Sequence, residues 1–368
     1  MINKERLINT FMEYVQISSE SLNESEMVNR LLEDLKALGL EAYVDNAGKT
    51  IGSNGNNIYC YIPGTLDKEI LLFSSHMDTV KPGIGIEPIV EDGYVKSKGN
   101  TILGGDNKAG VTAVIEALRS IKENNIPHRP MEVVFTICEE SGLLGAKNLD
   151  YSKIKSKKAI VLDTGGNVGK IAIQAPSQAN ITAKIIGKPA HAGNSPEQGI
   201  SAIMVGAEAV TNMKLLRIDE ETTANIGTFK ADGATNIVSP EVLFEAEARS
   251  LNQDKLDKQV DHMVKCLLDA AEKHGAKLDY HVDVNYQAFK VDEDNELIIE
   301  VEKACKKLGH QVSKVAVGGG SDANVFNNNG IDAINIGNGT ELVHTTDERL
   351  NIGEFEKLTD LVYELMTN

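Results

Sequence analysis

Short apolar runs that alternate with helical segments constrain this chain more than any other feature. Five runs have the length and apolar character of buried strands, and a helix with one apolar face separates the first two. Strands that alternate with helices predict an α/β fold, with a mixed, parallel-rich sheet and helices on both faces. The five runs are residues 69–75, 131–138, 158–163, 312–317 and 331–337, and the helix covers about 107–122.

The middle of the chain follows a different pattern, in which strands alternate polar and apolar side chains. Its order is strand, helix, strand, strand, helix, strand, which is typical of an α+β split βαβ (ferredoxin-like) unit. A length of 368 residues also favours two domains. We therefore predict one domain formed by 1–176 and 287–368, with a second domain, 177–286, inserted into it.

The charge balance excludes several classes of partner. The chain has 37 basic and 54 acidic side chains, for a formal net charge of -17. Because so acidic a surface repels phosphate backbones and anionic lipids, we expect neither nucleic acid nor membranes as partners. The N-terminus has no apolar run like that of a signal peptide, and the cysteines form no CxxC pair. These features predict a cytoplasmic protein.

Acidic and histidine residues follow the ends of the predicted strands. Ligands gather at the carboxyl ends of strands in an open α/β sheet, so these side chains are expected to converge. Each alone has a structural explanation, such as a helix cap or a solvated turn. Convergence of several on one sheet edge indicates a functional site. The residues are His76, Asp78, Asp106, Glu139, Glu140, Asp163 and His344.

These residues lie in segments that resemble the M20 family of dinuclear metallopeptidases, and within it the peptidase T group. The resemblance spans nearly the whole chain, and the segments occur in the same order. They are "SHMDTV" (75–80), "ILGGDNKAG" (102–110), "IPHRPMEVVFTICEESGLLGAK" (126–147), "DTGGNVG" (163–169), "GKPAHAGNSPEQGISA" (187–202) and "GGGSDANVF" (318–326).

The resemblance implies two divalent metal ions in each subunit. Imidazole and carboxylate donors suit zinc, cobalt or manganese, and we expect zinc. The implied ligands are His76, Asp106 and Asp163 for one ion, and Asp106, Glu140 and His344 for the other. Asp106 would bridge the two ions, and the peptide bond that follows it would be cis. Asp78 is implied to orient the His76 ring without touching metal.

Two glutamates stand side by side where a buried strand is predicted to end. Adjacent residues on an extended segment point in different directions, so Glu140 can face a metal ion while Glu139 faces a water molecule. The resemblance implies that Glu139 is the general base, which takes a proton from a metal-bridging water and returns it to the departing amine. We interpret the neighbouring Cys138 as a small buried strand residue with no catalytic role.

The inserted domain is implied to be a lid that also forms a homodimer. In the family, the residue that matches His191 stabilises the oxyanion, often from the partner subunit. Asn236 and Arg249 match lid positions that hold the substrate, although Arg249 could also be a solvent-facing strand residue. The Gly-rich segment that includes Gly319, Gly320 and Ser321 is implied to line the substrate cleft, with backbone amides at a helix start.

Together these features predict a metal-dependent aminopeptidase that cleaves short peptides. Two alternatives remain open. One is an N-acyl amino acid deacylase or dipeptidase that uses the same centre, and the other is a non-catalytic metal- or peptide-binding protein. The presence of every expected ligand and of Glu139 argues against the second alternative. The segment around His344 lacks the aromatic residues expected of peptidase T itself, so the sequence leaves the peptide preference open.

Overall fold

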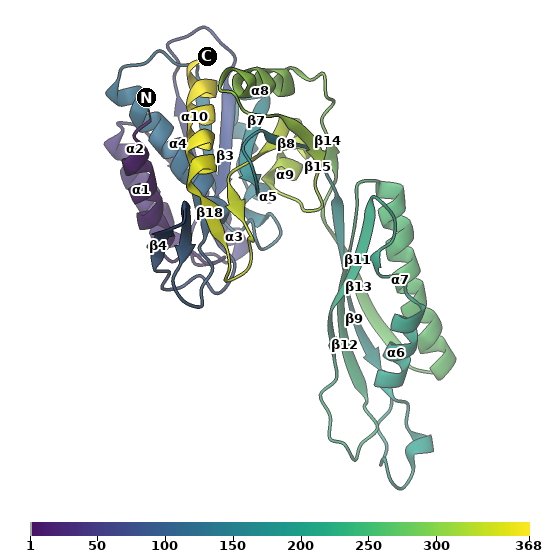
Figure 1. The fold of residues 1–368 in the computed structure, drawn as a ribbon. Coiled ribbons are helices and arrows are strands. Elements are labelled where there is room, and N and C mark those ends of the chain that lie inside the picture. The colour runs from purple at the N-terminus through teal and green to yellow at the C-terminus, as the bar shows by residue number, and fades with distance from the viewer. Residues whose placement is uncertain (1) are drawn as a thin grey trace. The chain divides into compact units, whose positions relative to one another are not determined.

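The computed structural model describes residues 2–368, and the contacts between residues divide the chain into two compact units. The first unit comprises the chain up to Gln174, together with Lys290–Val317 and Ser321–Asn368. The second unit comprises Ala175–Phe289 and Gly318–Gly320. Each unit has its own sheet, shown in Figure 1.

The first unit is built on a mixed sheet of nine strands, which confirms the predicted fold class. Its four adjacent strands β6, β3, β7 and β16 all run parallel to one another, and antiparallel strands flank them. In spatial order the strands are β1 (Ala42–Val44), β2 (Ile58–Ile62), β6 (Met131–Thr136), β3 (Leu71–His76), β7 (Lys158–Thr164), β16 (Asp332–Gly337), β8 (Lys170–Ala175) and β14 (Phe289–Lys290), and β15 (Ser313–Ala316) pairs with β8.

Helices cover both faces of this sheet (Figure 1). Every residue of β3 and β6 is buried, as their largely apolar sequences predict for strands covered on both sides. The connections β3–α4–β6 and β6–α5–β7 cross the sheet in opposite directions. Because such crossovers are right-handed, α4 and α5 lie on opposite faces. The helices are α1 (Lys4–Gln16), α2 (Ser25–Ala37), α3 (Ala47–Ile51), α4 (Gly105–Glu123), α5 (Leu144–Lys147), α8 (Glu296–Lys307), α9 (Asp322–Asn328) and α10 (Ile352–Thr367), with a 3-10 turn η1 (Tyr151–Lys153).

Helix α4 is the central helix of the first unit. It packs on β3 and β7, and α1 and α10 pack against it. This double coverage explains why nearly all of its residues are buried, including the predicted apolar face. A small antiparallel sheet lies in the same unit. Its strands are β17 (Thr340–Glu341), β18 (Arg349–Asn351), β5 (Tyr94–Ser97) and β4 (Pro88–Glu91).

The second unit is an antiparallel sheet with two helices. Its element order is the predicted strand, helix, strand, strand, helix, strand, with one short strand added. Alternate residues of β9 and β12, such as Ile181 and Phe244, form a core with Leu256 and Met263 of α7. In spatial order the strands are β10 (Leu216–Arg217), β11 (Thr222–Lys230), β12 (Glu241–Ser250), β9 (Ser177–Ile186) and β13 (Lys277–Tyr286), and the helices are α6 (Ala202–Asn212), α7 (Gln253–His274) and the 3-10 turn η2 (Pro196–Gln198).

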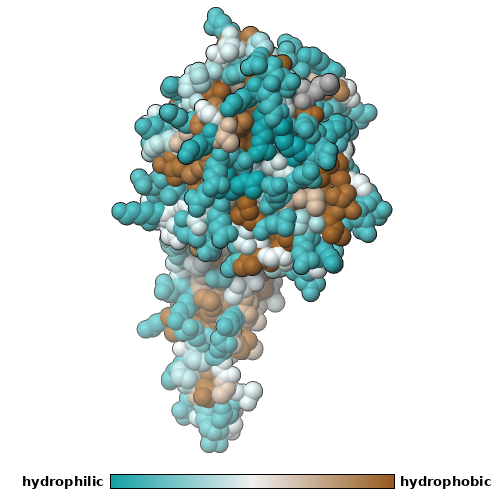
Figure 2. Space-filling view, turned by 90° about the vertical axis from the view of Figure 1, so that its left-hand side faces the viewer, coloured by the Kyte–Doolittle hydropathy of each residue, from teal (hydrophilic) through white to brown (hydrophobic). Residues whose placement is uncertain are grey.

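The polarity of the surface agrees with a composition in which 25% of the residues are charged. On the face that Figure 2 shows, most residues are hydrophilic, and apolar side chains form separate patches. Within residues 2–368, we find no helix with both the length and the apolar character that a membrane crossing requires.

Candidate metal centre

The four parallel strands bring the predicted site residues to one edge of the sheet. His76 is the last residue of β3, Asp163 lies at the end of β7, and Glu139 follows β6. Asp106 opens α4, and His344 lies in the loop after β17. The carboxyl ends of parallel strands meet at one edge, which is why segments distant in sequence come together here.

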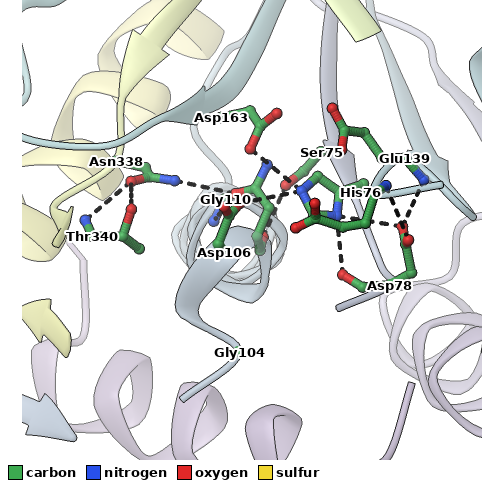
Figure 3. A network of polar contacts seen from close by, with 12 residues as sticks. Ser75, His76, Asp78, Gly104, Asp106, Gly110, Glu139, Asp163, Asn338 and Thr340 are labelled. Atoms are coloured by element: carbon green, nitrogen blue, oxygen red, sulfur yellow. Dashed lines mark hydrogen bonds and ion pairs between the residues drawn. The ribbon is translucent and has the colours of Figure 1, made fainter. Parts of the chain in front are cut away.

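Asp106 lies between two imidazole rings. Its Oδ1 is 3.2 Å from Nε2 of His76, and its Oδ2 is 3.4 Å from Nε2 of His344. His76 Nε2 is also 3.4 Å from Oδ1 of Asp163, while His344 Nε2 is 2.9 Å from Oε1 of Glu140. Figure 3 shows Asp106 and Asp163 directed toward the His76 ring. The two oxygens of Asp106 thus face two separate sets of donors.

Two groups of side chains have the spacing of metal ligands. Potential ligand atoms of His76, Asp106 and Glu140 all lie within 4.8 Å of one another, and so do those of His76, Glu139 and Asp163. Four carboxylates and two imidazoles in one cluster are the donors that zinc, cobalt or manganese bind. The donor set therefore fits two divalent ions that share ligands. Glu139, predicted as a base, lies close enough to His76 and Asp163 to belong to the second group.

The buried charges in this cluster perturb one another. Burial alone would lower the pKa of His76, but the carboxylates of Asp163 and Asp106 raise it well above its usual value. Burial raises the pKa of Glu139 and that of Asp163 well above their usual values. Carboxylates that are desolvated at such close spacing repel one another, so bound positive charge would stabilise this arrangement.

Asp78 contacts both glutamates through their backbone. Its backbone oxygen lies 3.0 Å from His76 Nδ1, and its carboxylate oxygen Oδ1 is more distant from the ring, at 3.4 Å. The carboxylate instead accepts hydrogen bonds from Glu139 N at 2.9 Å and Glu140 N at 3.2 Å. Ser21 Oγ donates a further bond of 2.7 Å to it. The Asp78 carboxylate therefore supports the turn that carries both glutamates, and its predicted role in orienting the His76 ring stays a prediction.

The two glutamates lie in a turn and not on an extended segment, so the predicted cause of their different directions is wrong. Strand β6 ends at Thr136, and Cys138 adopts a left-handed conformation with φ of 51°. The backbone oxygen of Glu139 accepts from Gly142 N and Leu143 N. Cys138 is buried, as predicted, but it lies beyond the strand. Burial, followed by the nearby Glu24 carboxylate, raises the pKa of its thiol, which makes it a poor nucleophile.

A carboxylate that the sequence did not single out supports Asp106. Glu348 is buried, and its carboxylate accepts hydrogen bonds from the backbone amides of Leu103, Gly104 and Asp106 at 2.8–2.9 Å. Burial raises the pKa of Glu348 to about 7. The Asp106–Asn107 peptide bond is cis, as the resemblance implies. In the sequence, Glu348 lies four residues after the predicted ligand His344, and this position is the one signal that could have pointed to Glu348.

Two more buried charged side chains lie in this part of the first unit. Asp322 accepts a hydrogen bond of 2.5 Å from Thr136 Oγ1, and its other carboxylate oxygen has no partner among the described residues. Burial raises the pKa of Asp322 to about 6. Lys108 donates to the backbone oxygen of Ile17 at 2.7 Å, and burial lowers its pKa to about 7. Both residues fall inside the family-like segments, but their burial is not visible in the sequence.

The predicted lid residues belong to the second unit. His191 Nδ1 accepts hydrogen bonds of 3.1 Å from Gly193 N and Asn194 N, which leaves the proton of a neutral ring on Nε2. The backbone oxygen of Asn236 accepts from Ala192 N at 2.9 Å. His191 and Asn236 thus come from paired segments of one loop region.

Arg249 already has a partner in this conformation. Its guanidinium group contacts the carboxylate of Glu247 through two hydrogen bonds of 3.0 and 2.9 Å, and it also reaches the backbone oxygen of Gly318 at 3.4 Å. A substrate carboxylate would have to compete with Glu247 for it. Arg249 is therefore part of an ion pair on β12 in this conformation, and its role in substrate binding stays a prediction.

Two amides of the Gly-rich segment, those of Gly320 and Ser321, are also occupied. Gly320 N donates to the hydroxyl of Tyr286 at 3.0 Å. Ser321 N donates to Asn324 Oδ1 at 3.0 Å, and Ser321 Oγ accepts from Ala323 N as the N-cap of α9. These two amides are thus not available to a substrate in this conformation, and the role of the segment in the cleft stays a prediction.

Comparison with known proteins gives extensive matches. Peptidase family M20/M25/M40 matches residues 72–368. An uncharacterized protein of Bacillus subtilis (strain 168), YqjE, is 43% identical over 366 residues, which cover 100% of this chain and 99% of the relative.

Two solved structures show the same fold at similar identity. The aminopeptidase PepT from Bacillus cereus ATCC 10987 is 44% identical with a TM-score of 0.89. A tripeptidase from Staphylococcus aureus subsp. aureus Mu50 is 42% identical with a TM-score of 0.95. Each match covers 100% of this chain and 98% of the other. The chain belongs to peptidase family M20/M25/M40 and is a peptidase.

Proposed function

We propose that this protein is a metal-dependent aminopeptidase that removes the N-terminal residue from short peptides. The observation that carries the proposal is the position of Asp106, whose two carboxylate oxygens face His76 and His344. One carboxylate between two imidazoles suits two ions that share a ligand. The similarity to an aminopeptidase and a tripeptidase at 44% and 42% identity supports a short-peptide substrate.

The proposed ligands follow from these contacts. His76, Asp106 and Asp163 would hold one ion, and Asp106, Glu140 and His344 would hold the other. We expect zinc, with cobalt or manganese as alternatives that suit the same donors. Bound there, two such ions would polarise the carbonyl group of the scissile bond and make a nearby water molecule more acidic.

Glu139 is the proposed general base. It is 8% exposed and lies beside His76 and Asp163, so its carboxylate faces the cluster and not bulk solvent. It would take a proton from the attacking water and return that proton to the nitrogen of the departing amine. Asp78 fixes the backbone of Glu139 and so holds the carboxylate in reach of the reacting atoms.

His191 is the proposed oxyanion donor. Two backbone amides donate to its Nδ1, so the neutral ring presents an N–H group at Nε2. An N–H donor aimed at the developing oxyanion stabilises the transition state. Asn236, on the paired segment, is the proposed neighbour that binds the substrate, and Arg249 would contribute only after release from Glu247.

We further propose that the second unit is a lid and the dimer contact. In the described chain, β10 pairs with Thr223 and Ala224 alone, which leaves the rest of the β11 edge open. Phe229 near the end of β11 is 40% exposed, and Ile203 and Met204 on α6 are also exposed. An open strand edge beside apolar side chains suits pairing with a second copy.

The proposed location is the cytoplasm. All four cysteines are free and buried. Reduced thiols are typical of proteins of the cytoplasm, where disulfides rarely persist.

A peptide panel tests the proposed function. Metal-loaded protein would be incubated with di-, tri- and tetrapeptides, with the same peptides acetylated at the N-terminus, and with N-acyl amino acids. We expect release of the first residue from free peptides and little turnover of the blocked ones. A preference for blocked amines would favour the deacylase alternative, and hydrolysis of dipeptides alone would favour a dipeptidase.

A further inference from the structure

Glu24 is a fully buried carboxylate that the proposed mechanism does not use. It precedes α2 and lies outside residues 72–368, the part of the chain that matches the family. Its Oε1 accepts from Cys138 N at 3.1 Å, Cys138 Sγ at 2.9 Å and Leu22 N at 2.9 Å. Its Oε2 accepts from Ser53 Oγ at 2.5 Å. A carboxylate removed from water needs such donors, and Glu24 has four.

The main partner of Glu24 is a residue in an unfavourable conformation. Cys138 has φ of 51°, a left-handed conformation that residues with a side chain rarely adopt. The chain leaves β6 here and turns toward Glu139 and Glu140. Because both the amide and the thiol of Cys138 donate to one carboxylate, Glu24 stabilises this conformation directly.

Three consecutive amides of this turn donate to buried carboxylates. Cys138 N contacts Glu24, whereas Glu139 N and Glu140 N contact the two oxygens of Asp78. Two carboxylates from separate parts of the chain therefore fix the path of residues 138–140. Without Glu24, the first amide of the turn would lose its partner, and Cys138 would be free to return to a negative φ.

We propose that Glu24 is a positioning residue for Glu139 and Glu140. By holding Cys138 in its left-handed conformation, it sets the direction in which the next two side chains leave the backbone. The inference rests on the proposed function, in which Glu139 is the base and Glu140 is a metal ligand. Glu24 itself touches neither the substrate nor the metal ions.

The chain offers a matched control at the opposite end of β6. Glu132 is also fully buried, and it accepts hydrogen bonds from Lys155 N, Ser156 N and the hydroxyl of Tyr59. Truncation of either glutamate leaves buried amides without a partner. Only Glu24 adjoins the turn of the candidate centre, so a purely structural role would give the two variants the same phenotype.

The experiment compares Glu24→Ala, Glu24→Gln and Glu132→Ala with the wild type. Thermal unfolding, kcat and KM for a tripeptide, and metal affinity by calorimetry would be measured. We expect both alanine variants to lose thermal stability. Only Glu24→Ala should lower kcat, by about 10- to 100-fold, the range typical of residues that orient metal ligands, with little change in KM. Glu24→Gln should recover most of kcat, because its amide oxygen can still accept from Cys138.

A double variant tests the conformational cause. Glycine adopts the left-handed conformation without steric cost, so Glu24→Ala combined with Cys138→Gly should regain part of the lost kcat. No recovery would overturn the inference, and so would equal losses of kcat in Glu24→Ala and Glu132→Ala. Should Glu24→Ala not fold, Cys138→Val tests the same turn. A β-branched residue strongly disfavours a positive φ, so this variant should lower kcat. Cys60→Val in β2 is its control and should keep the wild-type kcat.

The calorimetric readout separates this inference from the proposed function. A wild type without peptidase activity would contradict the aminopeptidase proposal. The inference would still predict weaker binding of one divalent ion in Glu24→Ala than in Glu132→Ala. An active wild type with unchanged kcat and metal affinity in Glu24→Ala would instead contradict the inference alone.

Discussion

Hydrogen bonds from backbone amides to carboxylates hold much of the candidate centre. Asp78 accepts from Glu139 N and Glu140 N, and Glu348 accepts from three amides around Asp106. Bonds to charged acceptors are stronger than neutral ones, and they fix the backbone from which the site side chains project. A change at such an acceptor should therefore alter the site without removing any ligand.

Asp78→Asn tests this at the residue scale. Asparagine keeps one acceptor oxygen but replaces the other with an NH₂ group, which cannot accept from Glu140 N or Ser21. We expect metal affinity or activity to fall by about 10- to 100-fold, with the fold retained. Metal titration would measure the affinity, and circular dichroism would check that the fold is retained. Wild-type affinity and activity in this variant would contradict the role given to Asp78.

Glu139→Gln separates the base from the ligands. A glutamine at this position has nearly the same shape but cannot take a proton, so we expect kcat to fall by at least about 10²-fold. Elemental analysis should still find two divalent ions, because the proposed ligands are unchanged. Glu140→Gln is the comparison variant and should lose metal. Persistent turnover in Glu139→Gln would assign the base to another residue.

The residue types of the centre could be predicted, but their supports could not. His76, Asp106 and Asp163 stand at strand and helix ends, where the topology of a parallel sheet must bring them together. Glu348 and Glu24 bind backbone amides that are distant in sequence, and their own neighbours in the sequence are ordinary polar residues. Apart from the position of Glu348 close to His344, nothing local distinguishes these buried acceptors from solvated glutamates.

At the scale of elements, the spacing of apolar residues predicted the strands and helices well, because burial of an element dictates which of its residues are apolar. The runs at 69–75 and 131–138 became the fully buried β3 and β6. The prediction failed where β6 ends, since Cys138 turns the chain into a left-handed conformation. That conformation depends on the distant Glu24, so local propensity carries no signal of it.

Gly110 shows how closely α4 packs on the sheet. An alanine Cβ there would lie 2.5 Å from Ser75 Oγ and 2.8 Å from the backbone oxygen of Leu162. Alanine favours a helix interior by about 1 kcal/mol over glycine. Overpacking typically costs about 1–3 kcal/mol. We therefore expect the cost of the clash to exceed the gain in helix propensity, so that Gly110→Ala destabilises the protein.

Denaturant unfolding would measure this cost. Gly353→Ala in α10 is the control, because its Cβ would meet only the Asn351 side chain, at 3.3 Å, which is a much milder contact than those at Gly110. Gly110→Ala should also lower activity, since the first turn of the same helix carries Asp106. Equal stability of the two variants would show that α4 can move away from the sheet.

At the scale of the whole molecule, the proposed dimer predicts complementation. His191→Ala and Glu139→Gln proteins should each be nearly inactive. If His191 serves the partner's site, a mixed dimer has one site with both changes and one with neither. After random exchange, about a quarter of all sites would be intact, as expected for a twofold dimer. Activity of the mixture measures this, and mass spectrometry proves the exchange. No recovery in exchanged dimers would confine His191 to its own chain.

The candidate centre draws its parts from positions far apart in the sequence, from Ser21 and Glu24 to His344 and Glu348. Synthesis must therefore have passed Glu348 before these parts can meet. A nascent chain that ends before His344 and Glu348 would be inert toward the peptides around it, so peptidase activity would begin only after this segment has been made.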